Sequence, residues 1–139
     1  MEPTRPDRAA RPIQVLVVDA DRRVRQSLCG LIDLADGMEI AGSASDVAGA
    51  LAGLAEQPVD LVLLDPRLPE FDTGKALVRR IGSDWPATRV VALCWPEDPV
   101  SIDARRLLVL PATVGPDALV ELLRSCATGV GPEGVAGLS

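Results

Sequence analysis

The residues best suited to do chemistry are three aspartates that follow runs of aliphatic side chains. Asp19 and Asp21 follow the run IQVLVV, and Asp65 follows the run LVLL. Carboxylate oxygens suit Mg²⁺, which in proteins usually takes one or two carboxylates together with water and phosphate oxygens. Two carboxylates held close together repel each other unless a proton or a cation lies between them. The pattern therefore favours a Mg²⁺ site, provided that the fold brings these acids together.

An alternation of strands and helices would position these aspartates. Continuous aliphatic runs are typical of strands buried on both faces, and they lie at residues 13–19, 38–44, 60–65, 89–94 and 107–111. Apolar residues at helical spacing predict helices at about 24–35, 47–54, 73–82 and 116–126. The segment 96–106 has only a weak helical pattern, which predicts a shortened fourth helix.

Five such β–α units predict an α/β fold with a parallel sheet between two helix layers, that is, a flavodoxin-like (βα)5 three-layer sandwich. The common strand order for five strands is 2-1-3-4-5. In that order the first and third strands are neighbours, so their carboxyl ends lie ~5 Å apart. We therefore expect Asp19 and Asp65 to share one crevice, at the edge where open α/β sheets place their sites.

Acids at strand ends also cap the following helix, so each aspartate has a structural alternative. Asp21 directly precedes the first predicted helix, and we favour an N-cap role for it. Ser45 is the predicted N-cap of the second helix. Asp65 is followed by PRLPEFD instead of a helix, so capping explains this residue poorly.

The stretches VLVVDAD and DLVLLDPRLPEFDTG resemble the receiver domain of two-component response regulators, over about residues 13–126. The resemblance implies that Asp65 is the phosphoacceptor and that Asp19 is the first acid of the metal pair. It also implies that the backbone carbonyl of Arg67 is a further Mg²⁺ ligand, and that a sensor histidine kinase is a partner.

The chain departs from the receiver pattern at the positions that assist phosphorylation. The second acid of the metal pair, which binds Mg²⁺ directly in the family, is Ala20 here. The hydroxyl that usually ends the fourth strand is replaced by Cys94, a weak donor, and the bulky Trp95 follows it. The lysine that usually ends the fifth strand is replaced by Leu110, and no lysine follows Lys75 in the chain.

The residue that reports phosphorylation in the family is also changed. The switch aromatic of the fifth strand is replaced by Leu107, or by Val109 in another register. Losing one preorganised stabilising donor typically costs ~10²–10³ in rate. These losses together predict an atypical receiver, or pseudo-receiver, with weak Mg²⁺ binding through Asp19 and Asp65 and little switching. The surface formed by residues 96–126 would then be held in one state to bind a protein partner or a second copy.

Two alternatives remain open. One is a conventional receiver that is phosphorylated at Asp65 with Mg²⁺ and still switches. The other is a haloacid-dehalogenase-type phosphatase that uses Asp19 as nucleophile and Asp21 as acid/base, because the two form a D-x-D motif. That class also needs a later lysine and usually a cap domain. A chain of 139 residues whose only lysine is Lys75 cannot easily supply them, so we do not expect an enzyme.

Composition and charge exclude several other classes. The chain has 139 residues and a net charge of −6, which favours one domain and argues against direct binding of nucleic acid. No apolar run approaches the ~18 residues of a membrane span, and three scattered cysteines form no disulfide framework. We therefore predict a cytoplasmic protein with reduced thiols. Residues 1–12 are expected to be a flexible arm and residues 127–139 a flexible tail or linker stub.

Overall fold

A computed structural model of the chain describes residues 11–68, 70–94, 107–111 and 115–127. Strands and helices alternate over most of this length, as the spacing of apolar residues predicts. The elements, in chain order, are β1 Ile13–Val18, α1 Arg22–Leu34, β2 Met38–Ala44, α2 Val47–Glu56, β3 Leu61–Leu64, α3 Phe71–Asp84, β4 Arg89–Cys94, β5 Leu107–Pro111 and α4 Pro116–Ala127.

The five strands form one parallel sheet in the order β2-β1-β3-β4-β5, which confirms the predicted fold and strand order. The central strands β1 and β3 are almost wholly buried, with four successive side chains inaccessible in each. This burial on both faces explains why their sequences are continuous aliphatic runs instead of alternating patterns.

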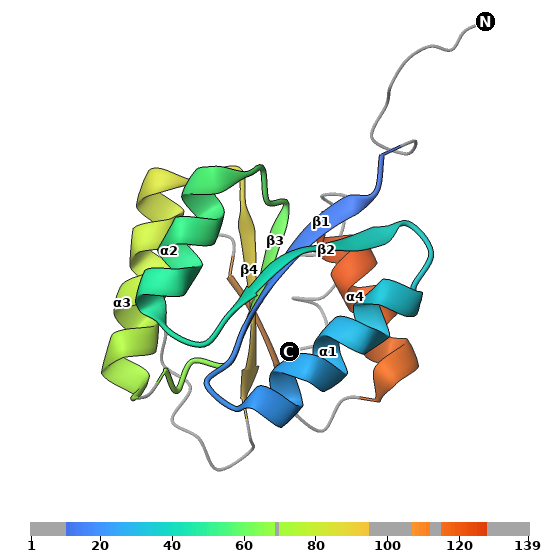
Figure 1. Cartoon of the computed structure of the whole chain (residues 1–139), viewed down its shortest axis with the longest axis horizontal. Coiled ribbons are helices and arrows are strands. Elements are labelled where there is room, and N and C mark those ends of the chain that lie inside the picture. The colour runs from blue at the N-terminus through green and yellow to red at the C-terminus, as the bar shows by residue number, and fades with distance from the viewer. Residues whose placement is uncertain (1–10, 69, 95–106, 112–114, 128–139) are drawn as a thin grey trace, which may run out of the picture.

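The helices cover the two faces of the sheet in pairs (Figure 1). One core contains residues of α2 and α3 with Leu16, Val62 and Leu64 from the sheet. The other contains residues of α1 and α4 with Val17, Leu61 and Leu63. Alternate residues of each strand thus enter opposite cores, as the period of two in a strand requires. The three-layer sandwich is therefore built as predicted.

The structure corrects several local predictions. The N-cap of α2 is Asp46, whose side chain accepts the Gly49 N–H at 2.8 Å, and the prediction of Ser45 is wrong by one residue. Helix α3 is longer than the predicted 73–82 at both ends, because it begins at Phe71 and ends at Asp84. Helix α1 begins at Arg22, two residues earlier than the apolar stripe indicated.

Some predictions lie outside the described residues. The shortened fourth helix was expected within residues 96–106, and most of the predicted arm and tail falls in residues 1–10 and 128–139. None of the helices within the described ranges is long and apolar enough to cross a bilayer.

Candidate functional site

Asp19 and Asp65 leave neighbouring strands at the same edge of the sheet. Val18 of β1 is in register with Leu64 of β3, and each aspartate is the next residue along its strand. The Asp65 N–H donates to the Val18 carbonyl at 3.0 Å, which extends the pairing of the two strands to the site. The backbones of Asp19 and Asp65 therefore lie next to each other at one edge of the sheet, and their sharing of one cation site stays a prediction.

Asp19 is a buried acid, with only 3% of its surface exposed. Burial raises the pKa of this carboxyl above its ordinary value, and the negative charges of Asp65 and Asp21 raise the pKa further. A hydrogen bond from the Asp21 N–H to Asp19 Oδ1, at 2.8 Å, acts in the opposite direction. The charge of Asp65 thus disfavours the ionised form of Asp19, as expected of acids on neighbouring strands.

Arg25 is a positive charge beside Asp19 that the sequence analysis did not identify. Its Nη1 donates to the Asp19 carbonyl oxygen at 2.8 Å, and its charge lowers the pKa of the Asp19 carboxyl. The only signal in the sequence is its position one helical turn after Asp21, which places it over the N-terminal end of α1. Arg25 partly offsets the repulsion among the acids.

Asp65 is more accessible than Asp19, with 26% of its side chain exposed. Its Oδ1 accepts the backbone N–H of Arg67 at 3.0 Å, and the Arg67 Nε lies 4.0 Å from the same oxygen. The carboxylate thus begins a tight turn that brings the backbone of Arg67 next to it. The Arg67 N–H therefore lies beside the Asp65 carboxylate, and the role of the Arg67 carbonyl as a metal ligand stays a prediction.

Helix α3 holds the turn that follows Asp65. A Cβ atom added to Gly74 would lie 1.7 Å from the Pro66 carbonyl oxygen, so only glycine lets the helix approach this closely. Pro66 and Leu68 are buried beneath the turn. Gly74 therefore fixes the position of the loop behind Asp65, and the sequence analysis missed this role.

Asp21 caps the N-terminus of helix α1. Its Oδ1 accepts the N–H groups of Arg23 at 2.8 Å and Val24 at 3.3 Å, which confirms the predicted N-cap. Ala20 is exposed and brings no ligand atom in its side chain. Among the described residues, no group of three or more His, Cys, Asp or Glu side chains is placed to hold a metal ion.

The remaining predicted site positions cannot be placed as side chains. Cys94 ends β4 and pairs in register with Pro111 of β5, directly after Leu110. The side chains of Cys94, Leu107 and Leu110, and the whole of Trp95, lie outside the described part of the chain. The structure therefore shows that β4 and β5 end beside each other. The residue types at these ends are known from the sequence.

The chain matches the family model described as "Response regulator receiver domain" over residues 15–109. It is 33% identical over 89 residues to protein-glutamate methylesterase/protein-glutamine glutaminase 5 of Anaeromyxobacter dehalogenans, which covers 64% of this chain and 24% of that protein. It is also 35% identical over 81 residues to the transcriptional regulatory protein CitT of Bacillus subtilis, which covers 58% of this chain and 35% of that protein. The chain thus spans only about a quarter to a third of these relatives.

Two solved structures are similar to this chain in fold. The signal receiver domain of an HD domain-containing protein from Pseudomonas fluorescens Pf-5 superposes with a TM-score of 0.74 at 26% identity, over 84% of this chain and 94% of that one. The response regulator domain of Thermotoga maritima CheB superposes with a TM-score of 0.68 at 22% identity, over 85% of this chain and 98% of that one. The second likeness is one of fold alone.

Proposed function

Because the chain belongs to the response regulator receiver domain family, we propose that it is an atypical receiver that acts mainly through protein–protein contacts. Receiver domains of this family serve two-component signalling, accept a phosphoryl group and typically bind Mg²⁺ at that site. In this chain Asp65 is the proposed phosphoacceptor, and a sensor histidine kinase is the proposed donor. Phosphorylation at Asp65 is slow or absent and changes the protein surface little.

One observation carries this proposal: the acidic site has two carboxylates where a third is expected. The middle residue of the Asp19–Asp21 motif is alanine, and the Asp21 carboxylate caps α1 instead of turning to the site. The donor set left for a cation is Asp19, Asp65 and the Arg67 carbonyl. This set fits Mg²⁺, which accepts one or two carboxylates with water, but it supplies less negative charge than three acids.

The proposed reaction is a direct transfer. An oxygen of the Asp65 carboxylate forms a bond to phosphorus as the bond between phosphorus and the donor breaks, and the donor leaves with that electron pair. Such transfers depend on positioning and on neutralising charge around the phosphoryl oxygens. A bound Mg²⁺ would supply positive charge there, and Arg25 and Arg67 supply positive charge from the chain itself.

Two further groups that would stabilise a phosphoryl group on Asp65 are missing from the sequence. No lysine exists after Lys75, so no lysine can follow β5, and the residue that ends β4 is a cysteine instead of a hydroxyl side chain. A ligand shifts a two-state equilibrium only by its different affinity for the two states. With these contacts missing, a phosphoryl group on Asp65 has little means of favouring one conformation.

Two alternatives to this proposal are a conventional receiver and a phosphatase. A conventional receiver keeps Asp65 phosphorylation and switching, and the same turn at Arg67 would serve it equally well. The phosphatase hypothesis needs Asp21 as a free acid/base, whereas the Asp21 carboxylate caps helix α1. This observation favours the capping role over acid/base catalysis.

Two measurements test the proposal. The chain is incubated with acetyl phosphate and Mg²⁺, and intact mass spectrometry follows the added phosphate, with Asp65→Asn as the control that has no acceptor. Hydrogen exchange across residues 96–126 is then compared with and without beryllofluoride. We expect little or no phosphate mass and little change in exchange. Rapid, stable phosphorylation with strong protection across residues 96–126 would instead establish a conventional receiver.

A further inference from the structure

Arg25 is a positive charge fixed at the acidic edge of the sheet. Its Nη1 donates to the Asp19 carbonyl at 2.8 Å, which ties the first half of α1 to the residue that follows β1. Arg25 is half-buried, whereas Arg22 and Arg23 in the first turn of α1 are exposed. The charge of Arg25 lowers the pKa of the Asp19 carboxyl. Arg25 is therefore held beside the acids instead of extending into water.

The stability of α1 does not explain a cation at this position. A helix carries a partial positive charge at its N-terminus, so cations near the first turn are unfavourable. Helix α1 begins at Arg22 and has no acid in its first turn to offset this effect. The position of Arg25, three residues later, is therefore explained better by the neighbouring acids than by the helix itself.

The charges at this edge nearly cancel without a metal ion. Asp19, Asp21 and Asp65 contribute three carboxylates, and the charges of the last two act on the first. Arg25 and Arg67 contribute two guanidinium groups, with Arg67 Nε 4.0 Å from Asp65 Oδ1. Three negative and two positive charges leave one negative charge in excess. The chain itself thus supplies most of the positive charge that its acids require.

A divalent cation gains less from such a site than from one that contains acids alone. Its interaction with each neighbouring charge is twice that of a monovalent ion, and this holds for attraction to a carboxylate and for repulsion from a guanidinium group. Ala20 acts in the same direction as Arg25, because an acid at position 20 would raise the negative excess. The missing acid and the retained arginine therefore both disfavour Mg²⁺.

We propose that Arg25 makes the folded domain less dependent on Mg²⁺. Its guanidinium group supplies part of the positive charge that a bound Mg²⁺ supplies, so the metal-free protein is more stable, and its affinity for Mg²⁺ is lower, than without this residue. The inference rests on the proposed function in one respect, since it takes Asp19 and Asp65 as the cation site. It does not require phosphorylation of Asp65, and its test contains no phosphoryl donor.

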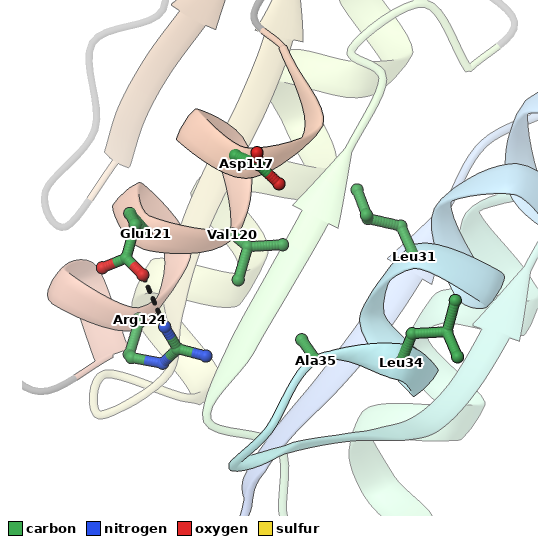
Figure 2. A pocket seen from close by; sticks show the side chains of 7 residues that line it. All are labelled: Leu31, Leu34, Ala35, Asp117, Val120, Glu121 and Arg124. Carbon is green, nitrogen blue, oxygen red and sulfur yellow. Dashed lines mark hydrogen bonds and ion pairs between the residues drawn. The ribbon is translucent and has the colours of Figure 1, made fainter.

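A purely structural role for Arg25 is the alternative that the test must separate. Arg124 provides the comparison, because it makes the same kind of contact after the other end of α1. Its Nη2 donates to the Asp36 carbonyl at 2.8 Å, and its Nη1 lies 2.7 Å from Glu121 Oε2 (Figure 2). Helix α1 has 13 residues and is roughly 20 Å long, so this contact lies far from Asp19. Loss of Arg124 therefore removes a comparable hydrogen bond without changing the acidic edge.

The first experiment measures urea unfolding in EDTA at pH 7. Arg25→Gln should lower the urea midpoint, because the carboxylates lose a neighbouring positive charge, and Arg25→Lys should lose less because it keeps that charge. In the Asp65→Asn background the loss caused by Arg25→Gln should fall to about half or less, since one of the acids is then neutral. Arg124→Gln should cause the same loss in both backgrounds. Should Arg25→Gln alone not fold, adding Asp65→Asn should restore folding.

The second experiment measures Mg²⁺ binding by isothermal titration and by the thermal shift at about 10 mM Mg²⁺. Arg25→Gln should bind Mg²⁺ about three- to tenfold more tightly than the wild type, since a repulsive charge is removed. The thermal shift should grow at least about twofold. Adding Asp65→Asn should remove most of this gain, because a carboxylate ligand is lost. Arg124→Gln should bind Mg²⁺ as the wild type does.

Two results would each overturn the inference. An equal loss of stability from Arg25→Gln with and without the Asp65 charge would make Arg25 a structural contact only. A Mg²⁺ affinity that is unchanged or weaker in Arg25→Gln would show that the charge of Arg25 does not oppose the cation. Rapid phosphorylation with strong switching would instead refute the proposed function and would leave both of these results unchanged.

Discussion

Replacing Asp65 by asparagine should stabilise the metal-free protein at pH 7. The exchange keeps the shape of the side chain and an oxygen that can accept the Arg67 N–H, but it removes the negative charge. Asp19 lies on the neighbouring strand and is 3% exposed. Burial raises the pKa of Asp19, and the charge of Asp65 raises it further. The folded wild type therefore contains a repulsion between Asp19 and Asp65 that the variant lacks.

The magnitude follows from the spacing of the strands. Neighbouring strands lie ~4.8 Å apart, so the two carboxylate charges are separated by roughly 6 Å. At an effective dielectric constant of ~20 the repulsion is about 3 kcal/mol. The 26% exposure of Asp65 reduces this value, and losing the partly exposed contact with Arg67 costs at most ~1 kcal/mol. A net stabilisation of about 1–2 kcal/mol remains, which corresponds to roughly 3–8 °C in Tm.

The effect should depend on pH in one direction. A carboxyl whose pKa is higher in the folded state favours folding below its unfolded pKa, and this contribution is lost as the pH rises through the folded pKa. For Asp19 the contribution is lost as the pH rises and returns on acidification. Asp65→Asn removes one cause of the raised pKa of Asp19, so the variant loses less stability than the wild type as the pH rises. The difference between the two proteins should be largest near pH 7 and should shrink toward pH 4.

Urea unfolding in EDTA, followed by far-ultraviolet circular dichroism from pH 4 to pH 8, measures this difference. Glu56→Gln is the matched control, since it removes one negative charge from the exposed end of α2. The control should change stability by less than about 0.5 kcal/mol. A loss of 1 kcal/mol or more in Asp65→Asn at pH 7 would refute the reasoning and would show that the Asp65 charge is a structural partner in the folded protein.

Three further predictions concern the same edge of the sheet. Ala20→Asp should tighten Mg²⁺ binding at least about tenfold by isothermal titration, since it restores a third acid; unchanged affinity would show that position 20 does not face the cation. Asp21→Ala should lower the free energy of unfolding by about 1 kcal/mol through loss of the α1 N-cap, whereas Ser27→Ala, in the exposed middle of α1, should not. Gly74→Ala should cost more than about 3 kcal/mol in urea unfolding, because its Cβ would overlap the Pro66 carbonyl; Gly82→Ala, which meets open space later in α3, is the control, and equal stability of the two variants would contradict this close approach.

The strand order and the meeting of Asp19 with Asp65 could be predicted because both follow from a simple pattern. Strands buried on both faces must be aliphatic throughout, so β1 and β3 are visible in the sequence and their ends are marked by the first polar residue. Helix boundaries were less certain, because Ser45 and Asp46 are both good N-caps and only the backbone conformation selects Asp46. Helix α3 begins at Phe71, before its apolar stripe, and its N-cap residue Glu70 makes no side-chain cap hydrogen bond that a sequence pattern could reveal.

The sequence by itself determined the chemistry available to this protein: an acid at the end of each of two buried strands, an alanine between Asp19 and Asp21, and no lysine after Lys75. These are facts of residue type, and no folding can supply a group that the chain lacks. Only the tertiary structure decided which groups act on one another. Arg25 reaches Asp19, Gly74 admits the Pro66 carbonyl, and Leu34 stays exposed beside α4. Each of these contacts, or its absence, depends on how helices pack on a sheet. That packing joins residues far apart in the chain, and local sequence patterns do not encode it.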